Sequence, residues 1–143
     1  MSLIDYLKGL TQTGGTRAGA GADTPREELS PCERELRRSL TETATHAQDT
    51  GRVRYELLFS GDVQGVGFRW TNQALARERG LTGWAKNLDD GCVRIQLQGS
   101  PAALATHLAR LHAHYQRFGN RIWLEEANRS AAVDNEGDFA VKL

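Results

Sequence analysis

The stretch SGDVQGVGFRW, residues 60–70, places three glycines between a strand pattern and a helix pattern. Before it, VRYELLF (residues 53–59) has apolar residues at alternate positions, which is typical of a strand with one buried face. After it, FRWTNQALARERG (residues 68–80) is typical of a helix that ends at Gly80. Because glycine adopts positive φ and leaves its amide open to a ligand, the stretch predicts a bare turn that leads into a helix.

A turn of this kind can bind an anion. The first N–H groups of a helix have no partner within it, and the helix dipole is positive at that end. A concave run of such amides most often takes phosphate. Arg69 falls in the first turn, and its planar guanidinium matches two phosphate oxygens. The spacing is neither a P-loop nor a dinucleotide fingerprint, so from spacing alone a phosphate loop and a turn without ligand both stay open.

The rest of the pattern predicts the fold. Strands are expected at residues 81–88, 92–99, 121–127 and, as a short last strand, 138–143. Asp90-Gly91 is a hairpin signal, and a helix with one continuous apolar face runs from Ser100-Pro101 to Gly119. The order β-α-β-β-α-β predicts a ferredoxin-like α/β (α+β) sandwich, with two helices on one face of an antiparallel sheet.

Residues 1–50 differ from the remainder. Residues 11–25 are small, polar and rich in glycine, which predicts a flexible linker. Ser30, Pro31 and Glu33 match an N-cap, a first helical residue and a capping box, so a helix is expected at about 31–45. Its apolar residues are few, so we expect it to gain little by packing. We divide the chain into an extension (1–50) and a compact domain (51–143).

Composition excludes several classes of protein. The chain has 143 residues, with 18 basic and 18 acidic side chains, so no net field attracts nucleic acid or an anionic membrane. Two cysteines are too few for a secreted disulfide scaffold, and no apolar run resembles a signal or a membrane span. We expect a cytoplasmic monomer without nucleic-acid or membrane partners.

Two motifs carry a family resemblance. GDVQGVGFR (residues 61–69) resembles the first acylphosphatase signature, G-x-V-Q-G-V-x-F-R, and GWAKNLDDGCVRIQLQG (residues 83–99) resembles the second. They occur in the family's order, and the resemblance covers about residues 52–143. It implies a metal-independent hydrolase that needs no cofactor and converts acyl phosphates into a carboxylate and inorganic phosphate.

The resemblance also assigns roles to residues. It implies that Arg69 binds the phosphate and that Asn87 positions the attacking water. The backbone of the loop would complete the phosphate site, with the residues Val63, Gln64, Gly65, Val66, Gly67 and Phe68. A carboxylate leaves without an acid, and phosphoryl transfer has a loose transition state, so positioning and charge stabilisation suffice.

Two alternatives to this hydrolase stay open. One is a noncatalytic module that binds phosphate or acyl phosphate, which an Asn87 turned away from the loop would favour. The other is the first domain of a carbamoyl-transferring maturation enzyme. Because the sequence stops after this domain, we expect this second alternative to be the weaker one.

Some positions depart from the family pattern. Asp62 stands where the family is often basic, and its charge puts phosphate affinity in doubt. Leu88 stands where some members have a hydroxyl, so we expect a modest effect on rate. Phe59 replaces an aliphatic residue, which is expected to be a packing change.

The remaining candidates have plain interpretations. Three histidines of the second helix are expected to be solvated rather than metal-binding (His107, His112 and His114). Trp70 and Trp84 either pack or form an apolar wall for the acyl group. A basic sheet face could come from three arginines (Arg52, Arg54 and Arg94), but an RNA binder would show paired aromatic residues on the exposed strands. Cys92 has no evident base and is expected to be inert.

Overall fold

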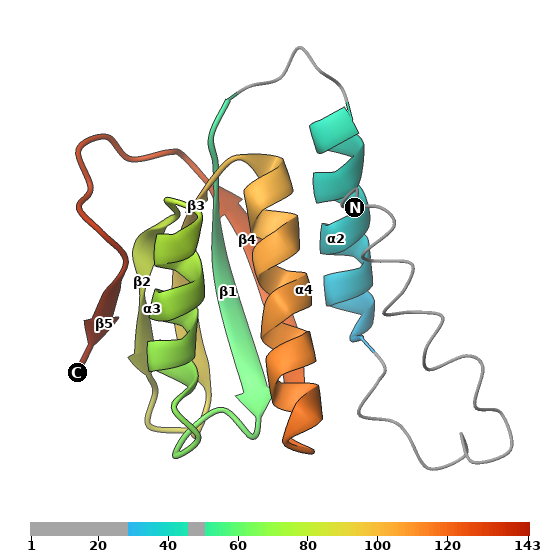
Figure 1. Cartoon of the computed structure of the whole chain (residues 1–143), viewed down its shortest axis with the longest axis vertical. Coiled ribbons are helices and arrows are strands. Elements are labelled where there is room, and N and C mark those ends of the chain that lie inside the picture. The colour runs from blue at the N-terminus through green and yellow to red at the C-terminus, as the bar shows by residue number, and fades with distance from the viewer. Residues whose placement is uncertain (1–28, 46–50) are drawn as a thin grey trace, which may run out of the picture.

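The computed structural model describes residues 29–45 and 51–143 (Figure 1). The expected linker at residues 11–25 lies outside these ranges. The described elements are α2 (Pro31–Thr45), β1 (Val53–Gly61), α3 (Phe68–Glu78), β2 (Thr82–Asn87), β3 (Val93–Gly99), α4 (Pro101–Arg117), β4 (Ile122–Ser130) and β5 (Ala140–Lys142). Each strand and helix expected from the sequence is present.

The sheet confirms the ferredoxin-like prediction and adds to it. Its strand order is β4-β1-β3-β2-β5. The pairs of β1 with β3, β1 with β4 and β2 with β3 are antiparallel. The short strand β5 is parallel to β2, so the sheet is mixed rather than fully antiparallel. Figure 1 shows α3, α4 and α2 side by side on one face of the sheet, so the described helix layer has a third member.

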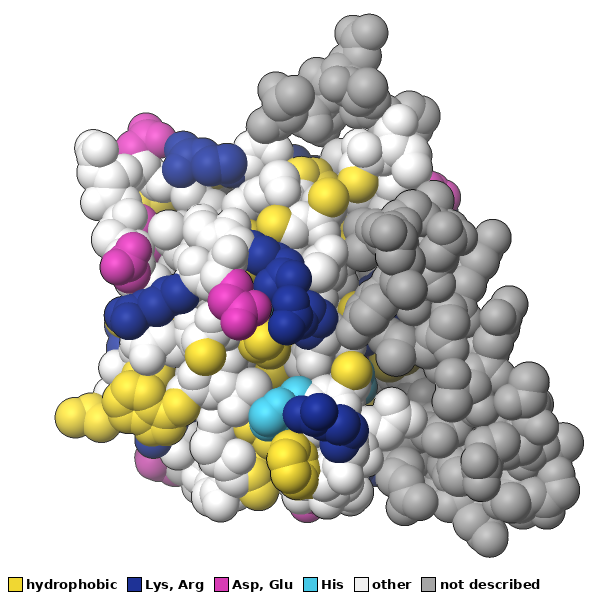
Figure 2. Space-filling view, viewed as in Figure 1, with side chains coloured by type: hydrophobic (Ala, Val, Ile, Leu, Met, Phe, Trp, Pro, Cys, Tyr) yellow, Lys and Arg dark blue, Asp and Glu magenta, His cyan; other side chains and the backbone are white. Residues whose placement is uncertain are grey.

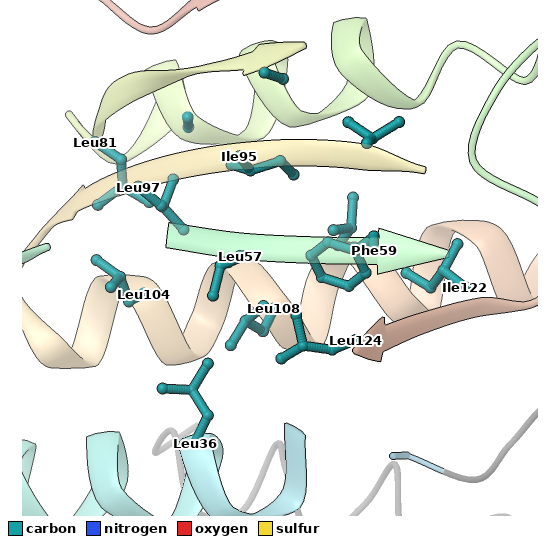
Figure 3. Packing of buried hydrophobic residues seen from close by; sticks show 14 of the residues in the cluster. Leu36, Leu57, Phe59, Leu81, Ile95, Leu97, Leu104, Leu108, Ile122 and Leu124 are labelled. Carbon is teal, nitrogen blue, oxygen red and sulfur yellow. The ribbon is translucent and has the colours of Figure 1, made fainter. Parts of the chain in front are cut away.

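The core lies between the sheet and this helix layer. Alternate residues of β1 and β3 point toward the helices, as the strand patterns predicted (Figure 3). Phe59 and Leu97 are fully buried, and Leu104 and Leu108 of α4 cover them from the other side. Phe59 is thus a core residue, in line with the expected packing change.

Helix α2 packs against α4 and β4. Leu36 and Leu40 are 5% and 2% exposed and join the core cluster. The Ser30 hydroxyl accepts a hydrogen bond from the Glu33 N–H at 3.0 Å and donates to the Leu124 carbonyl at 2.6 Å. The expectation that this helix gains little by packing was wrong, because two of its charged residues are buried as well and are paired.

The face of the sheet opposite the helices is not a free basic surface. Each of the three arginines expected there pairs with a carboxylate: Arg52 with Asp134, Arg54 with Glu136 and Arg94 with Glu56. Arg54 also donates to the side chains of Gln96 and Gln98. On the helix-covered face, basic and acidic side chains are interspersed (Figure 2). These pairings give no support to nucleic-acid binding.

Candidate active site

The glycine-rich loop joins the end of β1 to the start of α3. Gly65 and Gly67 have φ values of 78° and 73°, in the left-handed region that residues with side chains rarely adopt. A Cβ atom at either glycine would meet nothing within 4 Å, so it is the backbone conformation that requires glycine there. Among the described residues no side chain caps the N-terminus of α3. Its first amides are therefore placed to meet an anion.

The loop residues divide into buried and exposed ones. Val63 and Phe68 are each 1% exposed, so their side chains belong to the core, and the Val63 N–H donates to the Gly61 carbonyl at 2.9 Å. Gln64, Gly65 and Gly67 are exposed. The structure thus supports a cradle formed mainly by backbone, with core side chains at both ends.

Asp62 is held by the backbone at the start of β4. Its Oδ2 accepts a hydrogen bond from the Arg121 N–H at 2.8 Å, while its own N–H donates to the Arg121 carbonyl at 2.7 Å. The preceding Gly61 lies so close that a Cβ there would sit 2.4 Å from the same carbonyl oxygen. The carboxylate therefore has a local function: it fastens the beginning of the loop to β4.

Arg69 lies in the first turn of α3 and reaches toward β5. Its Nη1 donates to the Lys142 carbonyl at 2.6 Å. A guanidinium carries five N–H donors in a fixed plane, and this bond uses one of them. The bond to β5 restricts where the guanidinium can lie while leaving further donors for an anion at the loop.

Asn87 is the last residue of β2, and the notable atom is its side-chain oxygen. Its Oδ1 is buried and has no hydrogen-bond partner among the described residues. Buried amide oxygens are nearly always paired, because leaving one unpaired costs about 1–3 kcal/mol. This oxygen can therefore accept a hydrogen bond from a donor such as water.

Gln64 connects the loop to the turn that follows Asn87. Its Nε2 donates to the carbonyls of Leu88 and Cys92, at 2.8 and 2.9 Å. The Leu88 N–H in turn donates to the Cys92 carbonyl at 2.8 Å. Leu88 thus takes part in this connection through its backbone carbonyl and N–H. The two sequence motifs meet through these bonds.

Tyr115 is a contact of the loop that the sequence did not reveal. It lies on α4, and its hydroxyl is 3.1 Å from the Val66 carbonyl oxygen and 3.0 Å from Thr71 Oγ1. In the sequence it belongs to the apolar face of the helix. A buried tyrosine hydroxyl usually finds a partner, and that was the one available signal.

The three helix histidines differ from the prediction that they are solvated. His107 is 1% exposed, its Nε2 lies 2.9 Å from Asn72 Oδ1, and burial, with a smaller effect of Arg79, lowers its pKa to about 3. His112 pairs with Glu33 at 2.7 Å, and His114 packs against the rings of Tyr115 and Phe118. In the part of the chain that the structure describes, no group of three His, Cys, Asp or Glu residues could hold a metal.

The two tryptophans are not core residues. Trp70 follows Arg69 and is 59% exposed. The Lys142 ammonium lies 4.2 Å from the ring centroid of Trp84, a cation–π contact that keeps this ring on the sheet. Burial, with a contribution from Asp90, raises the pKa of the Cys92 thiol.

Comparisons with known proteins agree with this geometry. The family model for acylphosphatase matches residues 55–141. The chain belongs to the acylphosphatase family. It is 42% identical over 81 residues to an acylphosphatase of Marinobacter nauticus, which covers 57% of this chain and 74% of that one. It is 40% identical over 91 residues to an acylphosphatase of Clostridium acetobutylicum, covering 62% of this chain and 94% of that one.

A solved structure of the family has the same fold. The acylphosphatase from Bacillus subtilis superposes with a TM-score of 0.52 and 28% identity, over 64% of this chain and 99% of its own. All residues discussed for the site lie within the matched family region except Lys142, whose carbonyl holds Arg69. Of the helices in the described ranges, none has the length and apolar character that a membrane crossing requires.

Proposed function

We propose that this protein hydrolyses acyl phosphates to a carboxylate and inorganic phosphate, with Arg69 and the loop amides binding the phosphoryl group and Asn87 orienting the water. The family supports the activity. The observation that carries the residue assignment is the buried Oδ1 of Asn87, which has no hydrogen-bond partner in residues 29–45 and 51–143. It lies at the end of a strand that Gln64 connects to the loop.

The first part of the proposed site binds the phosphoryl group through the positive charge of Arg69 and the N–H groups of the loop. The Val63 N–H donates to the Gly61 carbonyl, so the amides of residues 64–68 are the ones that would meet a phosphoryl group at the start of α3. The Arg69 guanidinium adds a positive charge and a planar set of donors. Three negative oxygens of a phosphoryl group are best stabilised by donors that are already oriented, because no reorganisation is then needed in the transition state.

The second part of the proposed site is Asn87, which only has to orient the attacking water. An acceptor such as Asn87 Oδ1 can take one proton of a water in a hydrogen bond and so fix where its lone pair points. A carboxylate is a stable leaving group, and the transition state is loose, so a strong base is not required. A module that merely binds phosphate gains nothing from an unpaired buried carboxamide, which favours the hydrolase over the binding module.

We also propose that residues 51–143 carry this chemistry and that the preceding residues are accessory. The family match and every assigned side chain fall within 51–143, which supports the division. We propose a cytoplasmic monomer as its form, a location supported by Cys32 and Cys92, which are both free thiols.

The test is the initial rate of benzoyl phosphate hydrolysis by the full chain. We expect Arg69→Ala and Asn87→Ala each to lower kcat/KM by ~10²–10³-fold without lowering the melting temperature. Arg77→Ala on the exposed side of α3 and Asn128→Ala on β4 are the matched controls and should keep the wild-type rate. EDTA should change nothing. Retention of the wild-type rate by either site variant would overturn the assignment of that residue.

A further inference from the structure

Tyr115 connects α4 to the middle of the loop. The residue is 2% exposed, and its ring packs against Phe68, the first residue of α3, with centroids 5.5 Å apart. The ring is thus fixed by the core, and the hydroxyl reaches the Val66 carbonyl at 3.1 Å from a rigid base. The structure brings the two together across 49 residues of sequence.

The direction of the hydrogen bonds follows from the number of protons. A carbonyl oxygen can only accept, so the single phenolic proton of Tyr115 goes to Val66. The Thr71 hydroxyl, 3.0 Å away, must then donate to the Tyr115 oxygen. Burial raises the pKa of Tyr115, so the phenol stays protonated and remains a donor at neutral pH.

The Val66 carbonyl belongs to the same peptide group as the Gly67 N–H. In a planar trans peptide the two point in opposite directions. Since Tyr115 holds the carbonyl toward the protein interior, the Gly67 amide is directed to the outer side of the loop. Gly67 is exposed there, and a Cβ on it would meet nothing within 4 Å, so the space is open to a ligand.

Without the anchor this peptide group could turn over. Its rotation changes ψ of Val66 and φ of Gly67, and glycine accepts φ of either sign at little cost. Gly67 now has φ 73°. In the absence of the Tyr115 bond, glycine at position 67 would thus permit a second orientation of this peptide, which presents a carbonyl oxygen, not an N–H, to an incoming anion.

We propose that Tyr115 is a positioning residue, whose hydroxyl orients the Gly67 amide toward the phosphoryl oxygens of the substrate. This proposal rests on the proposed function, because it assumes that the loop binds phosphate. It assigns to α4, which bears neither Arg69 nor Asn87, a part in phosphate affinity.

The experiment compares the wild-type full chain with Tyr115→Phe, which keeps the ring and removes the hydroxyl. Inorganic phosphate is the probe, first as a competitive inhibitor of benzoyl phosphate hydrolysis and then in an NMR titration of the Gly67 amide. Loss of one oriented donor should weaken phosphate inhibition and lower kcat/KM by about three- to tenfold. The phosphate-induced shift of the Gly67 amide should shrink.

Two further variants separate positioning from packing. Tyr55→Phe on β1 is the matched control and should leave both readouts unchanged. Thr71→Val removes the donor to Tyr115 but leaves the bond to Val66, so its effect should stay below about twofold. Tyr115→Phe with wild-type phosphate inhibition and a wild-type Gly67 shift would overturn the role of Tyr115 alone. A wild-type protein that neither binds phosphate nor hydrolyses benzoyl phosphate would overturn the proposed function with it. Should Tyr115→Phe fail to fold, absence of any Gly67 shift in the wild-type titration overturns the proposal.

Discussion

Two of the polar contacts of helix α4 lie three residues apart and differ in kind, one with α2 and one with the glycine-rich loop. His112 points to α2, where it meets Glu33 at 2.7 Å. Tyr115 points to the glycine-rich loop, where its hydroxyl meets the Val66 carbonyl at 3.1 Å. The first contact lies between ionisable groups and fastens a helix. The second lies between neutral groups and directs one peptide of a loop, so we expect the first to govern stability and the second to govern function.

The contact with α2 is one part of a buried charged cluster. Glu33 is fully buried and receives a hydrogen bond from Arg37 Nε at 2.9 Å, and Arg37 Nη2 donates to the Leu108 carbonyl of α4 at 3.2 Å. Burial would raise the pKa of Glu33, but His112 and Arg37 outweigh it, and the pKa is lowered. The carboxylate therefore stays charged, and the helix depends on its partners.

The largest expected effect comes from removing this carboxylate. Glu33→Ala leaves the Arg37 side chain, which is 9% exposed, without its ion partner. Deleting one member of a buried pair typically costs about 3–5 kcal/mol, so the free energy of unfolding should fall by that order. Urea unfolding followed by circular dichroism measures it.

The control for this variant lies on the same helix. Glu35→Ala breaks an exposed pair with Arg38 and should leave the urea midpoint unchanged. At a temperature where Glu33→Ala is folded, its kcat/KM should equal the wild-type value. A large loss of activity with unchanged stability would mean that the two contacts of α4 are not separate.

A pH titration sharpens the comparison through another histidine of α4, His107. The folded protein keeps His107 neutral, with a pKa of about 3, against an ordinary value of 6.5. Below pH 6.5 the unfolded chain binds a proton that the folded protein does not, so stability falls with pH until about 3. The loss should be roughly 2 kcal/mol between pH 6.5 and 5.

Substitution of this histidine tests the cause. His107→Gln cannot titrate and should flatten the profile in this window. The lowered pKa of Glu33 acts later, since its contribution is present above pH 4.5 and is lost as the pH falls further through the folded value. If His107→Gln kept the wild-type slope between pH 6.5 and 5, another group would be responsible for it.

Local patterns predicted the fold and the loop, because strand alternation and glycine spacing depend on neighbours in the chain. A local pattern could not predict that the charges of α2 are buried. In the sequence, Glu33 and Arg37 resemble solvent-exposed residues, and His112, the partner of Glu33, is 79 residues away from it. The pairing of β5 with the edge strand β2 could not be predicted either, because a strand of three residues is too short to indicate which strand it pairs with. Tyr115 lies on the apolar face that was predicted for the second helix of the domain, but the partner of its hydroxyl depends on the tertiary structure.

The next effect in size concerns the brace between the two halves of the site. Gln64→Ala removes both hydrogen bonds to the turn after Asn87. Because Asn87, the proposed acceptor for the water, is then no longer held in register with the loop, kcat should fall by about tenfold, while the melting temperature changes little. Steady-state kinetics with benzoyl phosphate measures this, and Gln116→Ala on α4 is the control. A change in KM alone would assign Gln64 to binding rather than to alignment.

The smallest effect is expected at Asp62, although its charge lies beside the cradle. Asn at this position keeps an oxygen that can accept from the Arg121 N–H, so the fastening of the loop to β4 should survive. The lost charge is exposed, and salt screens it over about 8 Å at 0.15 M ionic strength. Asp62→Asn should therefore lower KM for benzoyl phosphate by about twofold or less at 0.15 M salt, and by more at 0.01 M, because screening then weakens. A tenfold decrease that is the same at both ionic strengths would show that the carboxylate contacts the substrate directly, in conflict with its bond to Arg121.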